Sequence, residues 1–208
     1  NRHHISYNLM MIHANTQSVG DYNGKNSIFS DDYENLGFTR RQQTNDNMLI
    51  VNQLMTNWGL TKSLSLDAGA SYNMVKGYEP DRRINNLTKA EDGYTLLRGN
   101  SQQRYFSTLD EDDLNVKAGL VYRLKDNIDE ISNIRFGYTG RFVDDNFKAT
   151  EYNLTVGHVS TIPSLDDFSL DDYYNQENFA SDWFKIQKNL DEYTVKKNIH
   201  SAYAEATY

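Results

Sequence analysis

Residues 58–76 carry the side-chain pattern that most limits how this chain can fold. Apolar side chains occupy every second position from Leu64 to Met74, and Ser, Asp, Gly and Asn fill the positions between them. Side chains of a β-strand point alternately to opposite faces, so one face meets an apolar medium and the other meets water. The run of about 11 residues exceeds the ~5–6 common in soluble sheets and matches the ~9–11 of a tilted strand that crosses a bilayer.

The composition excludes a helical membrane protein. Only 38% of the 208 residues are hydrophobic and the mean hydropathy is −0.75, so much of the chain lies in water. The most apolar run, Leu9–Ile12, is far too short for a membrane helix. Strands of a transmembrane β-barrel are apolar only at alternate positions and are therefore compatible with this composition.

Six segments carry strand patterns, and long and short connections alternate between them. The strands are expected at 5–13, 46–58, 64–76, 114–124, 131–142 and 192–208. Residues 15–45, 77–111 and 144–190 are polar and predict long loops, whereas 59–62 and 126–130 predict tight turns. The pattern predicts an all-β fold, an antiparallel up-and-down meander of about six long strands with long loops at one end. Outer-membrane barrels have this arrangement, with short periplasmic turns and long extracellular loops, and it places both termini on the periplasmic side.

The sequence argues against several functions. A net charge of −8 argues against a nucleic-acid partner, and the absence of cysteine removes disulfides, thiolate metal sites and cysteine nucleophiles. The five histidines have no metal-ligand spacing. The acidic runs 110–113, 166–167 and 171–172 match no calcium-loop pattern. No catalytic motif is present, so we predict no enzyme activity, no metal site and no cofactor.

The longest predicted loop contains the candidate binding residues. Exposed aromatic side chains stack on flat ligands or anchor partner proteins, although the same side chains can instead pack the loop against its neighbours. Apolar residues from Phe179 to Leu190 recur at helical spacing, which predicts a short amphipathic helix there. The candidate ligand-binding residues are Tyr173, Tyr174, Phe179, Trp183 and Phe184.

Three segments resemble TonB-dependent outer-membrane receptors. The last strand with its lead-in, residues 190–208, looks like barrel strands of that family, and residues 7–20 and the turn at 57–62 are similar to its members in Bacteroidetes. The resemblance implies that residues 1–208 are a partial β-barrel segment of a larger transporter in the Gram-negative outer membrane, which imports a nutrient ligand with energy delivered through TonB. The plug domain and the TonB-contacting segment, both N-terminal in that family, are absent from these residues.

Two other classes share the strand pattern. A soluble β-sandwich acting as a surface binding or adhesion module also alternates, and a passive porin has the same strands in a smaller protein. Six strands of a barrel that closes with about 22 leave two open edges, so we expect the isolated segment to self-associate.

Overall fold

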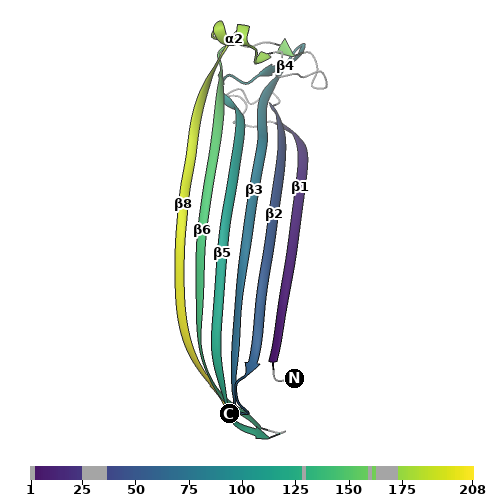
Figure 1. The fold of residues 1–208 in the computed structure, drawn as a ribbon. Helices are drawn as coiled ribbons and strands as arrows, with labels where there is room; N and C mark the ends of the chain where they lie inside the picture. Colours follow the sequence, from purple (N-terminus) through teal and green to yellow (C-terminus); the bar gives the residue numbers. More distant parts are fainter. Residues whose placement is uncertain (1–2, 25–36, 128–129, 159–160, 163–172) are drawn as a thin grey trace.

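The computed structural model describes residues 3–24, 37–127, 130–158, 161–162 and 173–208, and these form one antiparallel sheet (Figure 1). Its six long strands are β1 (His3–Gly24), β2 (Gly37–Gly59), β3 (Leu64–Ala90), β5 (Gly99–Asn127), β6 (Glu130–Val156) and β8 (Phe184–Thr207). They follow the order β1-β2-β3-β5-β6-β8, so each long strand lies beside its predecessor in sequence and the sheet stays open. The predicted meander is confirmed.

Three short elements lie at one end of the sheet. Strand β4 (Gly93–Leu96) pairs with β3 and with β7 (Thr161–Ile162), and helix α2 (Gln176–Ala180) precedes β8. We call this end the cap end. Both chain termini lie at the other end, as the strand count predicts (Figure 1).

The strands are about twice as long as the alternating pattern predicts. Most of the described residues in the predicted loops 15–45, 77–111 and 144–190 continue the strands, so the loop boundaries were wrong. Both faces of these extensions are mostly polar, so a regular alternation of apolar side chains no longer marks the strands, although the backbone pairing continues. Residues 25–36, 128–129, 159–160 and 163–172, which include part of the predicted loops and the tip of the second turn, lie outside the described residues.

The first predicted turn is confirmed and its hydrogen bonds are local. The backbone N–H groups of Leu60 and Thr61 donate to the carbonyl of Leu64 at 2.8 and 3.0 Å, and the Thr61 hydroxyl accepts from the Leu64 N–H at 3.0 Å. This connection returns the chain directly from β2 into β3.

The register places side chains of like character in rows across the sheet. Leu66, Leu120 and Phe136 are direct neighbours on β3, β5 and β6, whereas Asp67, Gly119 and Gly137 form the adjacent row on the opposite face. We call the two sides the Leu120 face and the Gly119 face. Past Glu79 the register of β3 shifts at Pro80, which lacks a backbone N–H and fits a bulge.

Candidate functional site

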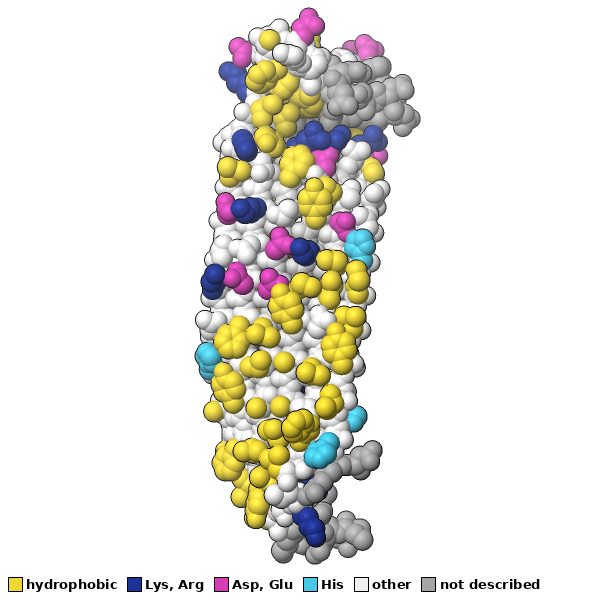
Figure 2. Space-filling view, in the orientation of Figure 1, with side chains coloured by type: hydrophobic (Ala, Val, Ile, Leu, Met, Phe, Trp, Pro, Cys, Tyr) yellow, Lys and Arg dark blue, Asp and Glu magenta, His cyan; other side chains and the backbone are white. Residues whose placement is uncertain are grey.

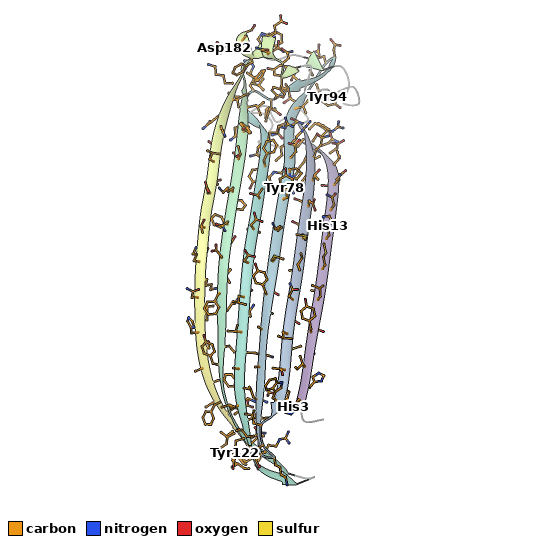
Figure 3. The ribbon with its side chains drawn as sticks, in the orientation of Figure 1. His3, His13, Tyr78, Tyr94, Tyr122 and Asp182 are labelled. Atoms are coloured by element: carbon orange, nitrogen blue, oxygen red, sulfur yellow. The ribbon has the colours of Figure 1, made fainter. Side chains whose placement is uncertain are left out.

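A compact hydrophobic cluster forms at the cap end, where α2 and β4 meet the long strands. Its members come from five strands and from the segment before α2, so distant parts of the sequence converge there. Tyr94 and Asp182, labelled in Figure 3, mark this end, while His3 and Tyr122 mark the other. The buried members are Phe38, Leu87, Leu96, Val156, Tyr173 and Phe184.

Helix α2 is a single short turn with defined ends. The side chain of Asn175 caps the helix by accepting a hydrogen bond from the backbone N–H of Asn178 at 2.8 Å. The side-chain amide of Asn178 donates to the Tyr173 carbonyl at 2.7 Å. After Ala180 the chain turns at Asp182, which has a φ of 58°. The predicted helix is therefore wrong beyond this point, because Ile186 and Leu190 lie in β8.

Tyr173 and Trp183 tie the helical segment to the end of β6. The Tyr173 hydroxyl lies 2.6 Å from the His158 carbonyl and 3.0 Å from the Trp183 carbonyl, so it donates to this pair of acceptors. The Gly157 N–H donates to the same Trp183 carbonyl at 2.8 Å. Burial raises the pKa of Tyr173, which keeps its hydroxyl protonated as a donor.

Beside this cluster lies a pocket of about 430 Å³ between the Leu120 face and the α2 segment. Aromatic rings dominate its walls. The rings of Phe106 and Tyr152 meet edge to face with their centroids 6.0 Å apart, and those of Tyr174 and Phe184 do so with a centroid distance of 4.9 Å. We call it the aromatic pocket. Its lining residues are Arg104, Phe106, Tyr152, Leu154, Tyr174, Asn175, Gln176, Phe179, Phe184 and Ile186.

A smaller polar cavity of about 120 Å³ shares three residues, Arg104, Leu154 and Tyr174, with the aromatic pocket. Arg83, Asn85, Gln102 and Gln103 complete its lining. The Tyr174 hydroxyl is buried and has no hydrogen-bond partner among the described residues. Burial, and to a lesser degree the neighbouring Tyr173, raises the pKa of Tyr174, so this hydroxyl also stays neutral.

Asp81 joins the two arginines of this region. Arg83 Nε donates to Asp81 at 2.7 Å, and Arg104 donates through Nε and an Nη at 3.1 and 3.0 Å. Burial raises the pKa of Asp81, but the hydrogen bonds from Arg104 and Arg83 lower it by more, and the net direction is downward.

The five aromatic residues predicted from the sequence lie close together, but only some of them line the aromatic pocket. Tyr174, Phe179 and Phe184 line the aromatic pocket, whereas Tyr173 and Trp183 pack behind it. Phe179 is 51% exposed, in contrast with Phe184 at 4%. Sequence reasoning missed Phe106, Tyr152, Leu154 and Ile186 as lining residues, although Arg104/Phe106 and Tyr152/Leu154 each show the spacing of two that marks one face of a strand.

The Gly119 face carries two further hollows, of about 330 and 430 Å³, in the half of the sheet that lies nearer the chain termini. Charged side chains there are arranged in pairs: Arg141 donates to Asp113 at 2.9 Å, and Arg135 lies 3.9 Å from both Asp67 and Glu205. Lys117 lines both hollows.

The acidic run 110–113 is divided between the two faces of β5. Asp110 and Asp112 lie on the Leu120 face of β5, whereas Glu111 and Asp113 lie on the other. Across the described ranges no group of three potential His or carboxylate ligands converges. The runs 166–167 and 171–172 fall outside those ranges.

These features define an all-β protein built on one open antiparallel sheet, with a small cap at one end. No family model and no curated protein matches the sequence. In the described part of the chain, no helix has the length and apolar character to cross a membrane.

Proposed function

We propose that this sheet is a wall segment of an outer-membrane β-barrel whose Leu120 face contacts lipid and whose Gly119 face lines an aqueous lumen. One observation carries the proposal, which is an apolar band that crosses all six long strands on the Leu120 face (Figure 2). Its side chains are largely uncovered: Tyr7 is 60% exposed, Leu120 45% and Phe136 60%. A soluble protein rarely leaves so extended an apolar surface uncovered.

The height of the band fits a bilayer. From Leu64 to Met74 the strand rises about 33 Å, and a tilt of about 45° reduces this to about 23 Å along the membrane normal, close to the ~25 Å apolar band of outer-membrane barrels. Trp58 and Tyr122 lie near the terminal edge of the band, where interfacial aromatic residues belong.

Polar side chains inside the band have partners within the sheet. The Tyr7 hydroxyl donates to Asn52 at 2.8 Å, and the Tyr138 hydroxyl lies 2.6 Å from Nδ1 of His200. Lipid tails offer no hydrogen bonds, so such pairing is required of any polar group that faces them.

The band ends abruptly on the side of the cap. Lys196 pairs with Asp144 at 3.2 Å in the row that includes Met74, and Lys76 pairs with Asp110 at 3.4 Å in the next row. Further along, Lys148 pairs with Glu192 at 2.7 Å. These rows would stand in water beyond the outer leaflet.

The resemblance to TonB-dependent receptors extends this proposal to active import of a nutrient ligand. The polar and hollowed Gly119 face supports a water-filled interior, which a passive porin would share. Uptake by the full-length protein that stops in cells lacking TonB would support active import. Uptake that continues without TonB would support the porin.

Site-directed cysteines test which face meets lipid, because residues 1–208 contain no cysteine, and any cysteine elsewhere in the full-length protein is first replaced by serine. In outer-membrane vesicles containing the full-length protein, Leu120→Cys should react slowly with a water-soluble maleimide, and Glu192→Cys rapidly. Bimane attached at Leu120→Cys should be quenched by spin-labelled lipid, whereas bimane at Ser201→Cys on the Gly119 face should not. Equally rapid maleimide reaction at Leu120 and Glu192 would overturn the proposal, because it would place the apolar face in water. Slow reaction at Leu120 without lipid quenching would also overturn it and would favour a covered apolar face, as in a sandwich.

A further inference from the structure

We propose that the aromatic pocket binds a planar aromatic molecule that carries one hydrogen-bonding substituent, such as a phenolic hydroxyl or a carbonyl group. The site lies at the cap end, beyond the rows of ion pairs that border the apolar band. The inference therefore stands independently of the proposed contact between the Leu120 face and lipid.

The shape and lining of the pocket select a flat apolar ring. Its volume of about 430 Å³ falls within the ~300–1,000 Å³ of small-molecule sites. Phe106 and Tyr152 line the pocket from the sheet, and Phe179 lines it from α2. Phe179 packs against Phe184 at 5.6 Å yet keeps 51% of its surface exposed, so a ring that enters the pocket would cover part of it.

The Tyr174 hydroxyl selects the polar substituent. A buried hydroxyl without a partner costs stability, and a native structure retains such a group where it has a use. Tyr174 lines both the aromatic pocket and the small polar cavity. The hydroxyl itself is buried, so a ligand ring in the first must shift the Tyr174 ring slightly for its substituent to meet this hydroxyl.

The charges nearby set a further limit on the ligand. Arg83 and Arg104 both line the polar cavity, and each donates to Asp81. Two guanidinium groups at the boundary repel a cationic substituent, since like charges in a partly buried site interact strongly. A phenol should therefore bind, and an aromatic ammonium compound of the same size should not.

The experiment is titration of the 208-residue chain in detergent micelles with 2-naphthol, and with 2-naphthylmethylammonium as the cationic comparison. We expect saturable binding of 2-naphthol and at least tenfold weaker binding of the ammonium compound, after subtraction of partitioning into empty micelles. Tyr174→Phe should weaken 2-naphthol binding about tenfold, the effect of one lost hydrogen bond in a desolvated site. Its thermal unfolding midpoint should stay unchanged or rise, because the unpaired hydroxyl is gone.

Two further variants separate binding from folding. Phe179→Ala should weaken binding while leaving the buried cluster intact, because Phe179 is half exposed. Tyr193→Phe is the matched control, since Tyr193 lies on the Gly119 face of β8 and lines neither cavity. Absence of saturable 2-naphthol binding, or wild-type affinity in Tyr174→Phe, would overturn the proposal.

Discussion

The ring of Tyr203 on β8 lies across Gly137, its directly paired residue on β6. A Cβ atom built on Gly137 would collide with Cζ of Tyr203, and one on Gly119 would lie 3.1 Å from the Tyr203 hydroxyl oxygen. Two glycines on neighbouring strands thus provide the surface on which one aromatic ring rests.

Gly137→Ala should therefore destabilise the sheet. The methyl group must displace the Tyr203 ring, which is 42% exposed and can move aside, so the cost should be about 1 kcal/mol, at the low end of overpacking effects. The free energy of unfolding in denaturant is the measurement. Gly77→Ala is the control, because the nearest atom to its added Cβ is Leu109 Cβ at an ordinary 3.4 Å. Equal changes in the free energy of unfolding for Gly137→Ala and Gly77→Ala would show that the Tyr203 ring is not held against Gly137.

Arginine substitution should separate the two faces of the sheet. Ala118 lies in the apolar band of β5, and Ser201 lies on the opposite face of β8. If the band contacts lipid, Ala118→Arg should cost about 2–4 kcal/mol of unfolding free energy in bilayers, the range for a cation near the midplane. Ser201→Arg should cost well under half of that. Similar losses at both positions would contradict the assignment of faces.

Acid should weaken the cap end through Asp81. The folded-state pKa of Asp81 lies below its ordinary 3.8, because hydrogen bonds from Arg104 and Arg83 outweigh the effect of burial. A carboxylate with a lowered pKa contributes stability above its unfolded pKa and loses this contribution as the pH falls through the folded pKa. The unfolding midpoint of the wild-type chain should therefore fall as the pH drops below about 4, and Asp81→Asn should show a smaller fall. The exposed pair of Asp182 and Lys185 supplies the control variant Asp182→Asn, which should follow the wild-type pH profile.

The isolated chain should self-associate. Strands β1 and β8 each have one paired neighbour in the sheet, so each presents a free edge of more than 20 residues. Sedimentation velocity in plain buffer should show oligomers that dissociate as detergent is added. A single monomeric species without detergent would contradict this expectation.

The side-chain pattern predicted the order of the long strands. It also predicted which residues share a face in the half of each strand that lies nearer the chain termini. Alternation is strict where one face is apolar, so the period of two alone assigns Leu66, Leu120 and Phe136 to one side. Beyond Lys76 and Asp110 the two faces are equally polar, and no period separates a strand from a loop. In that part of the sheet, cross-strand ion pairs and backbone hydrogen bonds hold the strands together. These contacts join residues that are far apart in the sequence, so the side-chain pattern of one segment does not predict them.

The aromatic pocket was partly predictable. Tyr174, Phe179 and Phe184 stand out in the sequence because they cluster in a polar region. Phe106 and Tyr152 lie far from them along the chain, and only the register of β5 with β6 brings the two rings together. The apolar spacing from Phe179 to Leu190 suggested a helix, but Asp182 turns the backbone through a positive φ and starts β8 instead.

The division of residues 110–113 between two sides of β5 has a consequence for chemical access. If the sheet is a barrel wall, a carbodiimide added outside the cell would reach Asp110 and Asp112 directly, but would reach Glu111 and Asp113 only by entering the lumen. Blocking the mouth of the lumen should then protect two of four consecutive acids and leave the other two reactive.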